Sequence, residues 1–484
     1  MTFRKKVLLI IISLLLVAVG YVGLRAGRVL WYPNSEMRQS EQQDLMDNYY
    51  GCLRLSMLST EELSKGDIEY FRGISTKEVE YCFRNLKDMN AFLEDAYGYQ
   101  EALGMIYLYL DPVEIGKQYG GMARFYGEAY RENLVTLMSQ HPETSFECVI
   151  PAYSAAYLSG LSDKERNNLE TYIIDFFNVL EGQENVNIYY VGFEEWLVSN
   201  EANYIDERLY NHEVNSFVTA LVIRDDYYAL TRENLQERLN QARQIASDYG
   251  TAESSDLSGY EIVFLGDSVF GNYTDSMSIP GVVAGLTGAN TFNCAQGGCP
   301  ATNDEEALLS FERMVSRFIC GDITELEDCV YKAGVQEYLE KHEDDKKLCF
   351  VINFGLNDFF GGHAVANVSD ANDSKTFAGA MRNGIRMLRE AYPEASILVM
   401  SPNQVIFFGN GTEPQSEVGG ALEEYVEAAR DVAGEFGVAY LDIYSESVIT
   451  VETSEYYLED GCHPGERGRF VLGQEIIRMI EEIN

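Results

Sequence analysis

The chain has 484 residues, of which 46% are hydrophobic, and it carries 77 acidic against 36 basic side chains. This length predicts more than one domain, and the hydrophobic content is sufficient for packed cores rather than a disordered chain. A net charge of −41 repels nucleic acid and gains nothing from anionic lipid headgroups, so the composition excludes DNA- and RNA-binding functions.

Residues 1–30 are predicted to form a cytoplasmic tip and one transmembrane helix. The basic residues 4–6 precede an uncharged run from Val7 to Leu24, whose 18 residues span about 27 Å as a helix. Ala18-Val19-Gly20 is a poor cleavage site, which favours an uncleaved signal anchor over a cleaved signal peptide. The basic residues favour a cytoplasmic N-terminus, so everything after about residue 30 is expected outside the cell membrane.

Residues 31–250 are predicted to hold a helical region and an α/β domain that resembles a later part of the chain. Arg131–Pro151 aligns without a gap with Arg382–Pro402, and both segments predict a helix, a Pro-Glu turn and a strand. Common ancestry and convergent α/β patterning both explain this similarity. Residues 236–255, helical and then rich in Ser and Asp, are predicted to be the linker that follows.

Residues 256–484 alternate short apolar runs with amphipathic stretches, which predicts a central parallel sheet between two layers of helices. The expected strands are Glu261–Leu265, Thr291–Asn293, Leu348–Phe354, Ser396–Met400 and Val438–Asp442.

Three of these strands end on residue types that carry chemistry, and so does the loop before the last helix. The motifs are Gly266-Asp267-Ser268, Gly297-Gly298, Gly355-Leu356-Asn357-Asp358 and Asp460-Gly461-Cys462-His463. A serine at the carboxyl end of a strand lies where open α/β folds place their active sites. Glycine N–H and asparagine amide groups can stabilise an oxyanion, and Asp-x-x-His supplies a base with the carboxylate that orients it. Each motif alone is also compatible with an ordinary turn.

In this order the four motifs resemble the sequence blocks of the SGNH (GDSL-type) hydrolase superfamily, over roughly residues 258–484. The resemblance implies a flavodoxin-like α/β/α fold and a serine esterase that needs no cofactor. It implies that Ser268 is the nucleophile, His463 the general base and Asp460 its orienting carboxylate. The oxyanion donors would be Gly298, with Gly297 as the neighbouring alternative, and Asn357, together with the N–H of the serine. Cys299-Pro300 and a long acidic insertion at 303–347 depart from the family pattern, so the shape of the site cannot be carried over.

The earlier copy lacks this equipment. Asp206-Glu207-Arg208-Leu209 takes the place of Asp460–His463, and no Gly-Asp-Ser occurs before residue 258. We therefore interpret the first domain as a degenerate SGNH-like domain without catalytic residues, serving as a spacer, a docking surface or a glycan-holding module.

The nine cysteines and five histidines show no zinc-binding spacing, so no metal site is expected. Cys320 and Cys329 bracket a short polar loop and are the first pair to test for a disulfide. The family resemblance brings the loops of Cys299 and Cys462 together and implies a second pair.

The leading hypothesis is a membrane-anchored esterase that removes O-acyl groups, especially acetyl, from envelope or extracellular carbohydrate. One alternative is an O-acyltransferase for cell-wall polymers, which would require a membrane partner to deliver the acyl group. Another is a non-catalytic envelope scaffold.

Overall fold

The computed structural model describes 51–55, 79–83 and 105–110 as strand backbone, and then 135–142, 145–206, 209–211, 214, 217–218, 221–222, 226–251, 255–303, 308–406 and 413–483. The chain divides into two compact units: residues 1–199 with 204–252, and residues 200–203 with 253–484. Among the described residues, no helix is long and apolar enough to cross a membrane. The predicted anchor at 7–24 lies outside the described residues.

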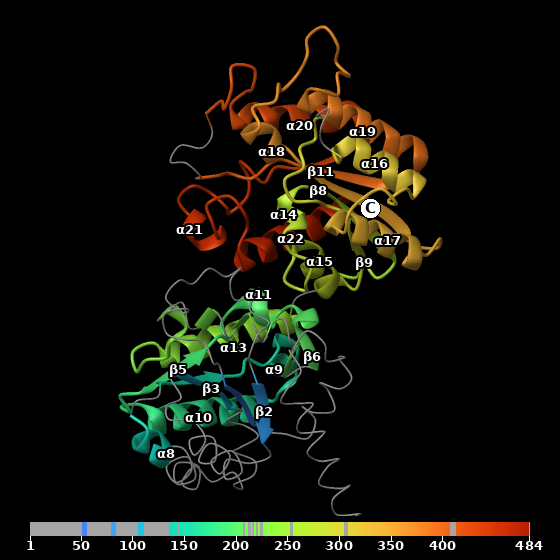
Figure 1. Ribbon diagram of the computed structural model, residues 1–484. Coiled ribbons are helices and arrows are strands. Elements are labelled where there is room, and N and C mark those ends of the chain that lie inside the picture. Colours follow the sequence, from blue (N-terminus) through green and yellow to red (C-terminus); the bar gives the residue numbers. More distant parts are fainter. Residues whose placement is uncertain are drawn as a thin grey trace, which may run out of the picture. The chain divides into compact units, whose positions relative to one another are not determined.

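The second unit is built on a five-stranded sheet in which all strands run parallel (Figure 1). Its strands are β8 (Tyr260–Gly266), β9 (Asn290–Asn293), β10 (Lys347–Asn353), β11 (Ser396–Met400) and β12 (Ala439–Leu441). The spatial order β12-β11-β10-β8-β9 is the 2-1-3-4-5 order of flavodoxin-like folds read from the other edge. The five predicted strands are therefore confirmed within one or two residues at their ends.

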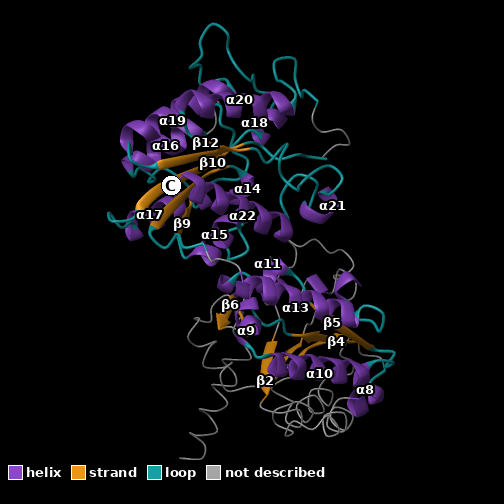
Figure 2. Ribbon diagram, turned by 180° about the vertical axis from the view of Figure 1, so that it is seen from behind, coloured by secondary structure: helices purple, strands orange, loops and turns teal. Residues whose placement is uncertain are grey.

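Helices cover both faces of this sheet, which confirms the predicted three layers. In both ribbon views α16, α19 and α20 lie on one face, and α15 and α22 lie on the other (Figures 1 and 2). Their bounds are α15 (Ile279–Thr287), α16 (Phe311–Cys320), α19 (Phe377–Ala391), α20 (Leu422–Phe436) and α22 (Glu466–Ile483), while α17 (Val330–Lys341) packs beside β9.

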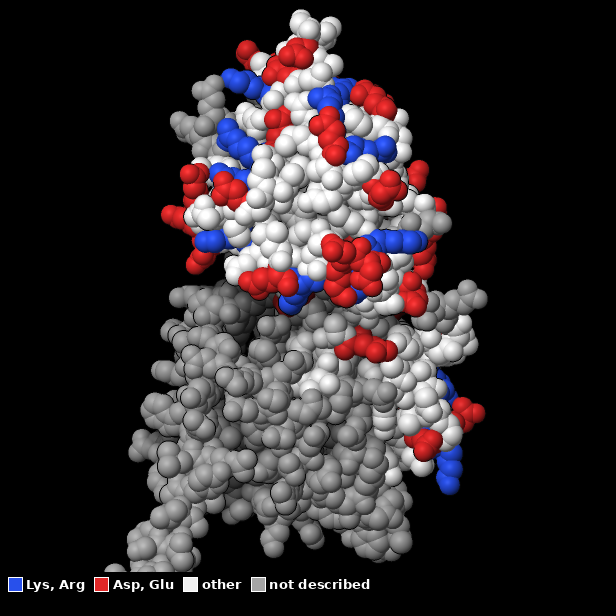
Figure 3. Space-filling view, turned by 90° about the vertical axis from the view of Figure 1, so that its right-hand side faces the viewer, with Lys and Arg blue, Asp and Glu red and all other residues white. Residues whose placement is uncertain are grey.

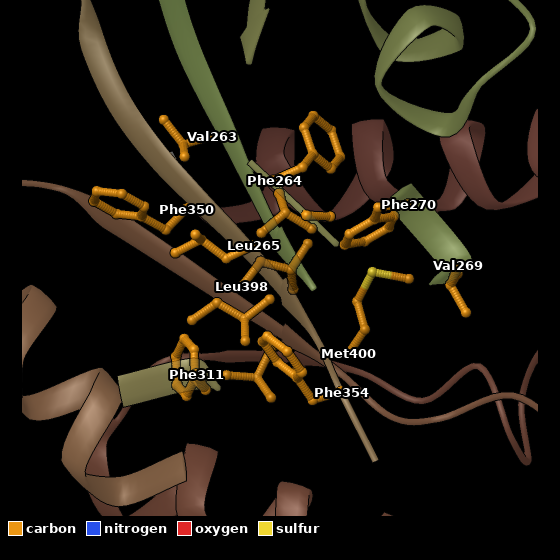
Figure 4. Close-up of a cluster of buried hydrophobic side chains, with 14 of the residues drawn as sticks. Val263, Phe264, Leu265, Val269, Phe270, Phe311, Phe350, Phe354, Leu398 and Met400 are labelled. Atoms are coloured by element: carbon orange, nitrogen blue, oxygen red, sulfur yellow. The ribbon is translucent and has the colours of Figure 1, made fainter. Parts of the chain in front are cut away.

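The core of this unit consists of the apolar sides of the central strands and the helices over them. β8 is buried over its whole length, and Phe264, Leu265, Phe350, Leu398 and Met400 are fully buried. Figure 4 shows them packed with Phe270, which follows Ser268 by two residues. The serine therefore projects from a rigid, close-packed base.

The first unit has a mixed five-stranded sheet of order β2-β1-β3-β4-β5. β3 (Met105–Leu110), β4 (Ser145–Ile150) and β5 (Val186–Tyr190) run parallel, whereas β1 (Gly51–Leu55) is antiparallel to both of its neighbours, β2 (Val79–Phe83) and β3. Helices α9 (Ala155–Gly160), α10 (Asp163–Leu180) and α13 (Leu235–Thr251) accompany this sheet, and the short helix α8 (Thr136–Gln140) precedes β4.

The linker prediction for 236–255 was wrong over most of its length. α13 is a regular helix of the first unit, and it packs against α9. Leu235, Leu239, Ala242 and Ala246 recur at helical spacing on one side of α13 and are buried. The polar residues on the other side gave the segment its linker-like composition.

Neither predicted disulfide is present. Cys299 and Cys462 are buried free thiols, and Cys320 and Cys329 are also unbonded. Buried cysteines pack as small apolar side chains, and burial raises the pKa of both Cys299 and Cys462 to about 12. Both thiols are therefore protonated and unreactive at neutral pH.

Candidate active site

A continuous chain of hydrogen bonds joins the three residues expected to carry the chemistry. His463 Nε2 lies 2.9 Å from Ser268 Oγ, and His463 Nδ1 lies 2.7 Å from Asp460 Oδ2. Ser268 and His463 are 195 positions apart in the sequence. The fold joins them because β8 and the loop before α22 end at the same edge of the sheet.

The position of Ser268 is fixed by the turn that ends β8. A side chain at Gly266 would place its Cβ 2.7 Å from the carbonyl oxygen of Asn353, so only glycine allows this close approach. Asp267 then caps the short helix α14 (Ser268–Gly271) by accepting the N–H of Val269 at 3.0 Å. Ser268 is consequently the first residue of a helix, with its hydroxyl partly exposed at the sheet edge.

Asp460 is held as a charged acceptor by the loop that carries His463. Its Oδ1 accepts the backbone N–H groups of Cys462 at 2.9 Å and His463 at 2.8 Å, while Oδ2 faces the imidazole. Partial burial raises the pKa of Asp460, but the hydrogen bonds from His463 and Cys462 outweigh it and lower this pKa to about 2.

The pKa of His463 shifts in the opposite direction to that of Asp460. The hydrogen bond to Asp460 raises the pKa of His463 above 6.5; burial opposes this shift, and the charges of Asp460, Asp267 and Glu459 reinforce it. A carboxylate that accepts from Nδ1 also leaves Nε2 unprotonated in the neutral ring, so Nε2 faces Ser268 as a base.

The paired glycines lie in the loop after β9, next to the serine. Gly298 has a φ of 78°, a backbone conformation that favours glycine, and a Cβ there would meet no atom within 4 Å. A Cβ on Gly297 would lie 3.8 Å from the Cβ of Ser268. The loop predicted to carry an oxyanion donor is therefore beside the nucleophile candidate.

Asn357 reaches the same edge from α18 (Leu356–Phe360), which starts after Gly355 at a φ of 126°. Its Nδ2 donates to Asp267 Oδ2 at 3.1 Å, which uses one of its two amide hydrogens. No other acceptor among the described residues takes the second hydrogen, which can therefore bond a ligand oxygen. Full burial raises the pKa of Asp267 to about 6, although the bonds from Val269 and Asn357 favour its charged form.

Three further polar residues hold these loops in place, and for one of them, Asp358, the sequence predicts this loop-organising role. Asp358 accepts the N–H groups of Ala301 and Thr302, at 2.8 and 3.0 Å, and so anchors the loop after Gly298. Asn293 Nδ2 donates to the carbonyls of Phe270 and Tyr273. Asn403 Nδ2 donates to the carbonyl of Cys462 at 2.9 Å. An asparagine shortly after a strand end gave the signal for Asn357, and the same signal could have identified Asn403, which follows β11.

Within the described part of the chain, no group of three or more His, Cys, Asp and Glu side chains is arranged to hold a metal ion.

A Ser–His–Asp hydrogen-bond chain at the carboxyl edge of a parallel α/β sheet is the arrangement of a serine hydrolase. Residues 264–469 match the GDSL-like lipase/acylhydrolase family. The chain therefore contains a GDSL-like lipase/acylhydrolase (SGNH) domain and is an enzyme of the esterase type. No curated protein aligns significantly with the chain.

Solved structures that resemble the chain each cover about half of it. A Lactobacillus plantarum protein is 17% identical and covers 46% of this chain and 97% of its own, with a TM-score of 0.36. The lipase/acylhydrolase from Enterococcus faecalis is 20% identical over 46% of this chain and 96% of its own, with a TM-score of 0.30. A carbohydrate acetylesterase from Sinorhizobium meliloti is 13% identical over 46% of this chain and 100% of its own, also with a TM-score of 0.30.

Proposed function

We propose that this protein is a membrane-anchored serine esterase that hydrolyses O-acyl esters, chiefly O-acetyl esters, of extracellular or cell-envelope carbohydrate. The observation that carries the proposal is the hydrogen bond of 2.9 Å between Ser268 Oγ and His463 Nε2, in a ring oriented by Asp460. A nucleophile bonded to a base, which is itself oriented by a third group, is the signature of covalent acyl transfer.

The reaction proceeds through an acyl-enzyme. Ser268 Oγ attacks the carbonyl carbon of the ester while its proton passes to His463 Nε2. The tetrahedral oxyanion receives hydrogen bonds from the N–H of Ser268, the N–H of Gly298 and the second amide hydrogen of Asn357. The bond to the sugar oxygen then breaks, and His463 returns the proton to the leaving alcohol. A water that loses a proton to His463 attacks the acyl-enzyme, which releases the acid and restores Ser268.

The charge and the N-terminus support an outward-facing enzyme. Residues 7–24 form an uncharged run behind a basic tip, and a net charge of −41 suits an exposed catalytic domain. On the face of the molecule in Figure 3, the Lys and Arg side chains of the described residues lie interspersed with Asp and Glu. The net charge of −41 does not favour binding of a polyanion, which argues for a small or neutral ester substrate. Protection of the C-terminal domain from protease in intact cells would contradict the proposed orientation.

The test uses the full-length protein in detergent with p-nitrophenyl acetate, butyrate and octanoate. We expect the acetyl ester to be the best substrate, and Ser268→Ala to lower kcat by about 10⁶-fold. Ser369→Ala changes an exposed serine in a surface loop and serves as the matched control. A fluorophosphonate probe should label wild type and leave Ser268→Ala unlabelled.

Three outcomes separate the alternatives. No labelling and no turnover in wild type would favour the non-catalytic scaffold. Labelling with faster acyl transfer to added glycan than to water would favour the O-acyltransferase. A preference for octanoate over acetate would exclude an acetyl esterase.

A further inference from the structure

A fully buried arginine lies directly behind the loop that carries Asp460 and His463. Arg469, in the first turn of α22, is only 1% exposed. A buried cation is costly unless carboxylates and hydrogen-bond acceptors surround it. The side chain therefore requires a structural explanation, and the Ser–His–Asp chain alone gives none.

The guanidinium joins the segment that follows Ser268 to the segment that follows His463. Its Nε donates to the carbonyl of Met277 at 2.8 Å, in the segment that follows α14 and Ser268. Its Nη1 donates to the carbonyl of Pro464 at 2.9 Å, the residue immediately after His463. One rigid, planar group therefore sets the separation of the two segments whose side chains meet in the bond between Ser268 and His463.

Tyr273 and Glu459 complete this connection. The guanidinium of Arg469 lies 3.9 Å from the centre of the Tyr273 ring, and the Tyr273 hydroxyl donates to Glu459. Glu459 precedes Asp460, and its backbone N–H donates to the carbonyl of His463 at 2.9 Å. The carboxylate of Glu459 lies 3.7 Å from Arg469 Nη1.

We propose that Arg469 is a positioning residue for His463, which fixes the imidazole against Ser268 and neutralises the neighbouring carboxylate of Glu459. This inference rests on the proposed role of His463 as the general base. The inference gives a function to Arg469, a buried side chain that takes no part in the hydrogen bonds between Ser268, His463 and Asp460.

The charges around His463 and Arg469 predict a change in the pH dependence of activity, which a purely structural role of Arg469 would not produce. Asp460, Asp267 and Glu459 all raise the pKa of His463. Arg469 is faced by Glu466, which accepts from its Nη2 at 2.9 Å, by Glu459 and Tyr273, and by Asp275. Burial lowers the pKa of Arg469, but these groups more than offset it, so the guanidinium stays charged. Loss of Arg469 removes a positive charge that lies 3.7 Å from Glu459, so the carboxylate acts more strongly on the imidazole, which then holds its proton more tightly.

The experiment measures kcat/KM for p-nitrophenyl acetate against pH in the full-length protein. The variants are Arg469→Met, Arg469→Lys, Glu459→Gln and the double variant Arg469→Met with Glu459→Gln. Arg478→Met is the matched control, because Arg478 is an exposed arginine of the same helix paired only with Glu482 among the described contacts. Histidine NMR in wild type, with His463→Gln for assignment, reads the protonation of His463 without turnover.

We expect Arg469→Met to lower kcat/KM at pH 7 about 10-fold. It should also move the acid limb of the pH profile, where kcat/KM falls as His463 is protonated, upward by about half a pH unit. Arg469→Lys should keep the wild-type limb but lose rate, because an ammonium cannot reproduce the planar contacts. Glu459→Gln should move the limb downward, and the double variant should restore its position without restoring the rate. If Arg469→Met does not fold, Arg469→Lys and Glu459→Gln still carry these predictions.

Rates and acid limbs of the Arg469 and Glu459 variants that match those of Arg478→Met would overturn the inference, and so would a loss of thermal stability alone. These outcomes are distinct from failure of the proposed function, in which wild type itself neither turns over the ester nor reacts at Ser268.

Discussion

The two sheets of this protein share three neighbouring parallel strands and differ in the strand beside them. In the second unit β10 is followed across the sheet by β11 and β12, and β8 runs parallel on its other side. In the first unit β3 is followed by β4 and β5, but the strand on its other side, β1, runs antiparallel. β1 therefore ends at the edge opposite to the carboxyl ends of β3, β4 and β5. A residue placed as Ser268 is after β8 could not face that edge.

The loops that carry the Asp-x-x-His motif and its earlier counterpart share one antiparallel backbone pairing. Tyr204 pairs with Tyr210 in the hairpin of β6 (Tyr204–Asp206) and β7 (Leu209–Tyr210), and Leu458 pairs with Pro464 six residues along in the same way. Asp460 and His463 are the second and fifth residues after Leu458, as Asp206 and Leu209 are after Tyr204. The comparison teaches that this hairpin does not depend on a histidine at the position of His463. It supports our proposal that the first unit is a degenerate copy.

The strongest test of this comparison exchanges His463 and Leu209, which take the same position in the two hairpins. We expect His463→Leu to lower kcat for p-nitrophenyl acetate by about 10⁶-fold, because removing the base is about as damaging as removing the nucleophile. The fold should survive, because leucine occupies the corresponding place in the first unit. The reciprocal Leu209→His should leave activity unchanged. Appreciable turnover by His463→Leu would remove His463 from the mechanism.

A smaller effect is expected at Asn357, the proposed oxyanion donor on α18. Asn357→Ala should lower kcat by about 10²- to 10³-fold with little change in KM, because the amide contributes to the transition state more than to substrate binding. Steady-state kinetics of this variant test the second amide hydrogen directly. A rise in KM at constant kcat would instead make Asn357 a substrate-binding residue.

A weaker and indirect effect is expected where Gly271 packs against the loop of Gly297 and Gly298. A Cβ on Gly271 would lie 2.9 Å from the backbone nitrogen of Gly297, so Gly271→Ala must displace the loop of Gly298. We expect about a 10- to 100-fold loss of kcat/KM, less than complete removal of one donor. Gly434→Ala is the matched control, because a Cβ there meets no atom within 4 Å and should stabilise α20 by about 0.5–1 kcal/mol. Equal activity of the two variants would show that the loop position is not critical.

The sequence was informative where function depends on local pattern and order along the chain. Buried strands that end on glycine, serine or asparagine are visible as apolar runs with abrupt polar ends, so the five strands and the meeting of Ser268, Asp460 and His463 could be predicted. The role of Arg469 could not, because its acceptors are backbone carbonyls of Met277 and Pro464, which carry no sequence signal. The helical part of 236–255 could also be predicted, but its assignment to a linker was wrong because the small apolar side of α13 is outweighed by polar residues.

The smallest predicted effect concerns pH, where activity and stability should change in opposite directions. In the proposed mechanism His463 acts as a neutral base. Because its pKa is raised above 6.5, chiefly by the hydrogen bond to Asp460, we expect kcat/KM to rise through an acid limb above pH 6.5. The same raised pKa means that the folded state binds this proton more tightly than the unfolded chain. The stability that His463 contributes is therefore complete below pH 6.5 and is lost as pH rises through its folded pKa.

Asp267, with a pKa raised to about 6, gives a similar loss of stability at lower pH, between about 3.8 and 6. Thermal unfolding of wild type and His463→Leu against pH separates the two, because only the loss above pH 6.5 should disappear in the variant. If His463→Leu still loses stability above pH 6.5, that loss belongs to another group, and the histidine that distinguishes the second hairpin from the first does not cause it.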